Sequence, residues 1–362
     1  MDLTVVAIPT YFATMGAEYL YLRKRRAQVG PSPADYERRD TVTSLTMGTL
    51  SLLAPLALPR LVVPFTPGKG KLGTALLATA AGAAAATTVA DVVARRGNDD
   101  DPPQSRRARR TRVARAAAKV AGVTAVVAGG VAASAWWRDK TRPEALWKKR
   151  VVRDLGRGPL ALAAAVIGWD FLYYWNHRLE HEHRALWAVH VVHHSSEHYN
   201  LSTALRQPVF ETFDMSVPYG LMSLFGIHPV LIEQARGINL LYQYWVHTEA
   251  IRTIGPAESV MNTASHHRVH HGRNRQYLDR NHGSIFIIWD KLFGTFEPER
   301  ERVRYGLTKN INTLDPVQVA THEHRAMLRD VANARSWRNR IGHLVRGPGW
   351  QPATSTAVGG GR

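Results

Sequence analysis

The stretches that decide how this chain folds are rich in histidine: His177-Arg-Leu-Glu-His181, His190-Val-Val-His193-His194 and His267-Arg-Val-His270-His271. Fourteen of the seventeen histidines lie between His177 and His282. On a helix, residues at i, i+3 and i+4 share one face, so each stretch aims two or three imidazoles at one point. Neutral imidazole is the commonest protein ligand for transition metals, and eight aimed rings suit two ions better than one tetrahedral ion. The spacing therefore predicts a site for a pair of metals.

An isolated histidine is more often an ordinary surface or core residue than a ligand. We interpret four histidines in that way: His228, His322, His324 and His343. His266 precedes the third stretch by one residue and is expected to point elsewhere. His183 and His282 have no predicted role.

The composition restricts the class of protein. The chain has 47 Lys and Arg against 29 Asp and Glu, a formal charge of +18. The basic residues gather between apolar runs and near the C-terminus, which favours loops beside an anionic membrane face and argues against nucleic acid. The chain contains no cysteine, and this excludes disulfides, thiolate metal sites and a cysteine nucleophile.

Several apolar runs approach the 20 or so residues that a membrane span requires. We predict spanning helices over residues 3–22, 43–65, 72–94, 116–137 and 159–175, and a hairpin over 208–227 and 229–246. Basic residues follow the first run at Arg23-Lys24-Arg25-Arg26, which indicates a cytoplasmic end. Tracing the runs from there brings every histidine stretch to the same face. The predicted fold class is all-α: a multi-pass integral membrane helical bundle with a cytoplasmic, histidine-rich di-metal cap.

The same patterns divide the chain into three predicted parts. Residues 1–150 hold N-terminal membrane helices with a basic cytoplasmic loop over 95–115, which carries eight arginines. Residues 151–315 form the predicted catalytic domain. Residues 316–362 form a polar, basic tail that is predicted to be partly disordered.

The order HxxxH, HxxHH, HxxHH between apolar runs resembles the fatty acid hydroxylase and sterol desaturase superfamily. Residues around the histidines resemble its alkylglycerol monooxygenase branch in particular. The segments that carry this resemblance are 173–177, 193–197, 199–207, 241–249, 265–274 and 288–296.

The resemblance implies a membrane-embedded, iron-dependent monooxygenase that acts on a lipid with an alkyl or acyl chain. Nine histidines match ligand positions of the superfamily: His177, His181, His190, His193, His194, His247, His267, His270 and His271. The resemblance further implies a di-iron centre, with tetrahydrobiopterin as reductant in the alkylglycerol branch. Other members take electrons from a donor protein.

Metal-bound histidines usually donate their second N–H to a carboxylate or a carbonyl. Five carboxylates are close enough in sequence to accept: Asp170, Glu182, Glu197, Glu249 and Asp290. We predict Glu182 and Glu197 as the catalytic pair. An ordinary surface role is the alternative for each of them.

Two other functions remain open at this point. The first is a fatty acid or sterol hydroxylase or desaturase with a different electron donor. The second is a histidine-rich metal transporter, although transport sites lie near the bilayer midplane on broken helices. Here the histidines sit at the ends of apolar runs, beside Arg and Glu.

Overall fold

The computed structural model describes residues 3–97 and 101–353. The end of the predicted disordered segment, residues 354–362, lies outside this range. Within it the secondary structure is helical, apart from one isolated bridge between Met261 and Phe286. In chain order the elements are α1 (Leu3–Val6), α2 (Ile8–Val29), α3 (Arg38–Val62), η1 (Val63–Phe65), α4 (Gly73–Arg95), α5 (Arg106–Thr141), α6 (Pro143–Trp147), α7 (Pro159–Glu182), α8 (Arg184–His194), η2 (Leu201–Leu205), η3 (Glu211–Phe213), α9 (Leu221–Leu224), α10 (Pro229–Trp245), η4 (Gly255–Ser259), α11 (Ala264–His270), α12 (Ile288–Phe293), α13 (Pro316–Asn333) and α14 (Trp337–Val345).

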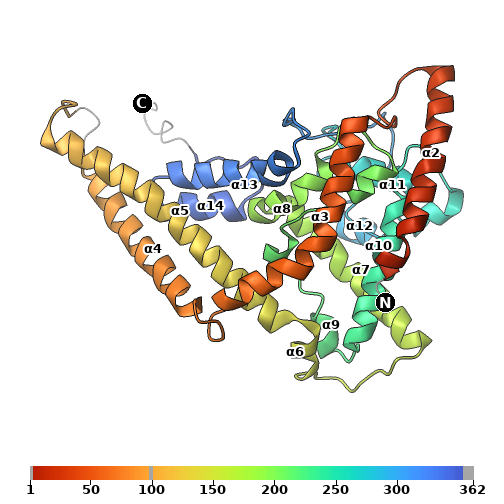
Figure 1. Cartoon of the computed structure of the whole chain (residues 1–362), viewed down its shortest axis with the longest axis horizontal. Coiled ribbons are helices and arrows are strands. Elements are labelled where there is room, and N and C mark those ends of the chain that lie inside the picture. The colour runs from red at the N-terminus through yellow and green to blue at the C-terminus, as the bar shows by residue number, and fades with distance from the viewer. Residues whose placement is uncertain (1–2, 98–100, 354–362) are drawn as a thin grey trace, which may run out of the picture.

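Three helical segments of the described chain are long and apolar enough to cross a membrane: Arg38–Phe65, Gly73–Arg95 and Arg106–Thr141. They confirm the predicted all-α membrane architecture, but the predicted span over 159–175 lies in α7 (Pro159–Glu182), which is not among the three. Figure 1 shows α4 and α5 as a long hairpin that projects from the body of the molecule. Most side chains of these segments face outward, as expected where lipid replaces a protein neighbour.

The arginine-rich segment predicted as a loop is largely helical. From Arg106 onward it forms the first turns of α5. Ser105 is the N-terminal cap of this helix, and its side chain accepts a hydrogen bond from the backbone N–H of Ala108. Arginine is a good helix former, and a helix already nucleated by the apolar run extends readily into it. Only residues up to Ser105 therefore connect α4 to α5.

The first apolar run forms a helix that is attached to the body of the protein. Its one charged residue, Glu18, is 7% exposed. The carboxylate of Glu18 accepts hydrogen bonds from Tyr36 Oη and the backbone N–H of Leu201 and contacts Thr248 Oγ1. These contacts make α2 a wall of the histidine-bearing body, and α2 is not among the three candidate spans.

The predicted hairpin over 208–246 is wrong in its first half. Residues 208–227 form an irregular segment with only η3 and the short α9, whereas α10 matches the second half. Two prolines, Pro208 and Pro218, and polar residues such as Asp214 interrupt any helical ladder there. This segment packs along α5, where Ser134 Oγ donates to the carbonyl of Phe213.

The first part of the C-terminal segment is helical. Residues 316–345 form α13 and α14, which pack on α8 and lie along α5 (Figure 1). Arg184 of α8 pairs with Glu323 and Asp330 of α13, both at 2.7 Å. In α14 the buried Arg340 pairs with the buried Asp91 of α4. These ion pairs attach the two C-terminal helices to the body of the protein.

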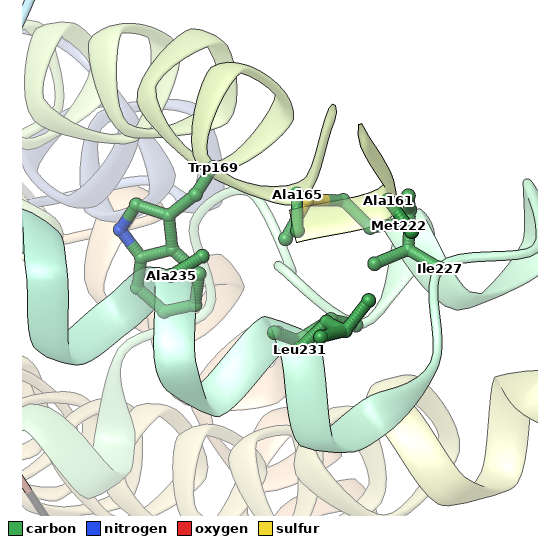
Figure 2. Close-up of a cluster of buried hydrophobic side chains, with 8 residues drawn as sticks. Ala161, Ala165, Trp169, Met222, Ile227, Leu231 and Ala235 are labelled. Atoms are coloured by element: carbon green, nitrogen blue, oxygen red, sulfur yellow. The ribbon is translucent and has the colours of Figure 1, made fainter. Parts of the chain in front are cut away.

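An apolar core lies between α7 and α10 (Figure 2). From α7 it takes Ala161, Ala165 and Trp169, at intervals of four residues along one helical face. The facing residues include Leu231 and Ala235 of α10. Small residues on α7 allow the two helices to approach closely, and this fixes the position of the polar end of α7, which begins at Asn176.

Candidate metal centre

Four elements bring the nine histidines together in the centre of the body. α7 supplies His177 and His181, α8 supplies three, α11 and its C-terminal cap supply three, and His247 follows α10. The nine histidines fall into two groups. Within each group, the ligand atoms all lie within 4.8 Å of one another. The first group is His177, His181, His190, His194 and His270, and the second is His193, His247, His267 and His271.

Each HxxHH stretch serves both groups, which corrects the expectation that a stretch aims at one point. His190 and His194 belong to the first group, whereas His193 between them belongs to the second. Residues at i and i+4 lie about 40° apart around a helix, whereas i+3 and i+4 lie about 100° apart. The i+3 histidine therefore faces a different centre from its two neighbours.

In the first group the Nε2 atoms converge. Nε2 of His190 is 3.0 Å from that of His177 and 3.1 Å from that of His194. Nε2 of His270 lies 3.2 Å from that of His194. His181 Nε2 is buried and has no hydrogen-bond partner.

The second group is built in the same way. Nε2 of His247 is 3.1 Å from that of His193 and 2.9 Å from that of His267. Nε2 of His271 lies 3.2 Å from that of His267. Metal–nitrogen bonds of about 2.1 Å place two ligand nitrogens roughly 3.0–3.4 Å apart, so both groups have the spacing of a shared ion.

Electrostatics also suit a metal. All nine rings are buried. Burial, reinforced by the neighbouring imidazoles, holds the pKa of each ring well below its ordinary value. The rings are therefore neutral at pH 7, and a neutral imidazole is the form that binds metal.

Backbone carbonyls fix the orientation of four rings. Nδ1 of His177 lies 2.9 Å from the carbonyl of His282, and Nδ1 of His270 lies 2.9 Å from that of Arg280. In the second group, Nδ1 of His247 lies 2.7 Å from the carbonyl of Gln243, and Nδ1 of His193 lies 3.3 Å from that of Arg206. A carbonyl only accepts, so each Nδ1 carries the proton and each Nε2 presents a lone pair to the centre.

Within the described residues, carboxylates lie beside ring nitrogens of the first group and not of the second. Glu180 Oε2 lies 3.1 Å from Nδ1 of His190, and Asp279 Oδ1 lies 3.4 Å from Nδ1 of His181. Neither residue was selected from the sequence. A helical projection would have found Glu180, which lies about 60° from His177 around α7.

The two predicted catalytic carboxylates lie elsewhere. Glu182 is about 140° from His177 around α7, and its carboxylate accepts from Arg178 at 2.9 Å, with 44% of its side chain exposed. Glu197 follows α8 and is exposed. The structure brings neither carboxylate into hydrogen-bond contact with any of the nine histidines, so their catalytic role stays a prediction from the sequence.

Two other acidic candidates order the loop beside the centre. Asp170 accepts from the backbone N–H groups of Ile285 and Phe286 at 2.7 and 3.1 Å. Asp290 accepts from those of His282 and Gly283, both at 2.7 Å. The carbonyl that holds His177 belongs to this loop. His282 is fully buried outside both groups, and His266 packs against Phe296, so neither joins a candidate metal position.

A second acidic residue lies behind Glu180. Asp214 is hydrogen-bonded to Glu180, which also accepts from Asn176 Nδ2 at 2.9 Å. Burial raises the pKa of Glu180 to about 8 and that of Asp214 to about 7, and the charge of Glu180 and its hydrogen bond further disfavour ionisation of Asp214. This arrangement holds a proton directly behind a metal-facing histidine.

The comparisons with known proteins address the family. A model of the family described as "Fatty acid hydroxylase" matches residues 162–295, which contain all nine histidines. The chain carries a fatty acid hydroxylase domain. The superfamily resemblance drawn from the histidine spacing is thereby confirmed.

Curated relatives of the hydroxylase domain are enzymes that act on lipids. Human alkylglycerol monooxygenase is 47% identical over 194 residues, which cover 54% of this chain and 43% of the relative. The Caenorhabditis elegans protein of the same name is 40% identical, covering 51% of this chain and 38% of the relative. An ornithine lipid hydroxylase of Rhizobium tropici is 26% identical, covering 39% and 44%.

The match spans less than half the length of the vertebrate alkylglycerol monooxygenases. The comparison with solved structures finds no match for the hydroxylase domain or the rest of the chain.

Proposed function

We propose that the chain is a membrane monooxygenase with two metal ions that hydroxylates a C–H bond of a lipid. One observation carries the proposal: two adjacent groups of buried, neutral histidines, with the spacing of metal ligands. The hydroxylase domain and its monooxygenase relatives support the same reaction class.

Iron is the metal that fits this proposal. An all-nitrogen donor set suits iron, copper or zinc, and zinc has no redox chemistry. Iron, when bound, would activate molecular oxygen for insertion into a C–H bond. The five histidines of the first group and the four of the second would hold the two ions.

The chain's own residues have defined tasks. Backbone carbonyls and Glu180 orient the imidazoles. Burial keeps the rings neutral and bulk water away from the centre. α7 links the polar centre to the apolar core of Ala161, Ala165 and Trp169, so an alkyl chain approaching along this helix would bring a C–H bond towards His177.

We infer an alkylglycerol as substrate, cleaved to a fatty aldehyde and a glycerol derivative once the carbon beside the ether oxygen is hydroxylated. Support comes from identity above 45% to vertebrate alkylglycerol monooxygenases over 186 to 194 residues. Tetrahydrobiopterin is the reductant that this assignment implies. A fatty acid or sterol hydroxylase or desaturase that uses an electron-donor protein is the second candidate, favoured by relatives such as mouse lathosterol oxidase at 26% identity.

We also propose that the centre faces the cytoplasm. The basic ends of α2 and α5, at Arg23–Arg26 and Arg106–Arg115, support this orientation through the positive-inside rule.

The test is the metal content of anaerobically purified full-length protein, followed by oxygen uptake with an alkylglycerol and tetrahydrobiopterin. Nearly two irons per chain with coupled aldehyde release is the expected result. If the protein contains iron but does not turn over the alkylglycerol, the reaction class still stands and fatty acids or sterols become the candidate substrates. Metal flux into vesicles without oxygen consumption would instead support the transporter.

A further inference from the structure

A polar pocket of about 430 Å³ lies beside α11, and none of the nine histidines lines it. The turn after α2 forms one wall, with Arg25 and residues 29–32. The segments after α10 and α12 form the other wall, with Arg252 and Arg302. Arg268 of α11 lines it too, next in sequence to His267.

The carboxylates of this pocket are already engaged. Glu299 accepts three hydrogen bonds from Arg268, two from Nε at 3.1 Å and one from Nη2 at 2.7 Å. Glu249 accepts from Tyr305 Oη at 2.9 Å. The other guanidinium nitrogen of Arg268 donates to the backbone carbonyls of Thr248 and Ile251. Arg268 is therefore a structural clamp on the segment that carries Arg252.

Three guanidinium groups of the pocket remain without a protein partner in the described chain: those of Arg25, Arg252 and Arg302. Like charges gathered at one concave place repel one another unless an anion joins them. The guanidinium fork matches the oxygens of a phosphate group, which it binds through two parallel hydrogen bonds.

The position of the pocket indicates the source of that phosphate. Along α2, Phe12 and Leu20 point outward with 56% and 64% exposure, as suits a lipid-facing surface. Arg25 lies little more than one helical turn beyond Leu20, so the pocket adjoins the end of this exposed apolar face, where a lipid lying along α2 would place its headgroup.

We propose that this pocket binds the phosphate group of an anionic glycerophospholipid, as a lipid site separate from the oxygenation centre. The shared chemistry is a phosphate ester held by Arg25, Arg252 and Arg302. A bound lipid would join the end of α2 to the segments that pack beside α11.

The test compares two triple variants of equal charge. Arg25→Gln/Arg252→Gln/Arg302→Gln removes the three pocket groups. The matched control is Arg23→Gln/Lys24→Gln/Arg275→Gln, which removes three exposed cations that do not line the pocket. Each protein is purified from mixed vesicles of phosphatidylglycerol and phosphatidylcholine, and the lipids that remain bound are counted by native mass spectrometry.

Wild type and control are expected to retain one phosphatidylglycerol, with affinity about tenfold higher than that of the pocket variant. Equal retention by the pocket variant would overturn the proposal. Inorganic phosphate is then titrated against the bound lipid. Failure to displace it supports a lipid headgroup, whereas displacement at millimolar concentration supports the phosphate site with a soluble source.

Metal content measured on the same samples shows that each variant is folded, since both sets of arginines and lysines lie outside the two histidine groups. If only the pocket variant loses its metal, that variant has failed to fold. The single variants Arg252→Gln and Arg302→Gln are then measured in its place. Retention of the lipid by both single variants at wild-type affinity would also overturn the proposal.

Discussion

The two histidine groups have the same ligand chemistry but different surroundings. The first has five imidazoles, and carboxylates lie behind His181 and His190. The second has four imidazoles, and backbone carbonyls orient two of them. Carboxylate support raises the basicity of a ligating imidazole, so the first group is expected to hold its ion more tightly. The second has one ligand fewer, which leaves more room for oxygen or substrate.

The largest expected effect comes from removing one ligand of either group. His270→Ala in the first group and His193→Ala in the second should each lose one of two ions. Activity should fall by more than about a hundredfold, because outer partners alone are worth 10–100-fold. Metal per chain and oxygen uptake are the measurements, with membrane insertion as control. Full activity in either variant would contradict the assignment of these histidines as metal ligands.

The second group also depends on a buried ion pair. Arg206, whose carbonyl orients His193, is fully buried and pairs with Asp40 at 2.7 Å. Arg206→Met leaves a buried carboxylate without its partner, and the expected loss of unfolding free energy is about 3–5 kcal/mol.

Thermal unfolding in detergent measures the loss caused by Arg206→Met. The control is the double variant Arg206→Met/Asp40→Asn, which should recover much of the stability because it removes both charges. A single variant as stable as wild type would show that the pair is dispensable.

Carboxylate support can be removed from the first group alone. Glu180→Gln should weaken metal binding there by about 10–100-fold and leave the second group unchanged. Glu182→Gln is the matched control, since Glu182 is two residues away and pairs with Arg178 at the surface. Chelator competition measures both affinities. If Glu180→Gln and Glu182→Gln bind metal in the first group with equal affinity, Glu180 does not strengthen metal binding there, and the proposed difference between the two groups is contradicted.

The last effect concerns Asp214, and it touches stability without removing a metal ligand. Its pKa is raised from 3.8 to about 7 in the folded protein, first by burial and then by Glu180. As pH rises from about 4 to 7 the unfolded chain ionises before the folded one, so stability falls by up to about 1.4 kcal/mol per pH unit. Asp214→Asn removes this cost and should stabilise the protein more at pH 8 than at pH 5. Thermal unfolding at the two pH values measures it, and an equal difference at both would contradict the assignment.

The sequence predicts the elements whose pattern is local. The spacing of His190, His193 and His194 identifies ligands, and the apolar runs identify α4 and α10. The sequence pattern says less where a distant contact decides the outcome. α14 is held in place because Arg340 meets Asp91 on α4, 249 residues away. Proximity in sequence does not separate Glu180 from Glu182, whereas direction around α7 does.

The pair of Asp91 and Arg340 has a consequence for biosynthesis. Asp91 lies in an apolar helix that reaches the membrane early, and its partner is made 249 residues later. At about 5–20 residues per second, the carboxylate waits roughly 12–50 seconds for its counter-charge. During that interval the α4–α5 hairpin holds an uncompensated acid, and the insertion machinery has to shelter it. A chain truncated before α14 would therefore leave the ribosome with Asp91 of the α4–α5 hairpin still lacking its ion-pair partner.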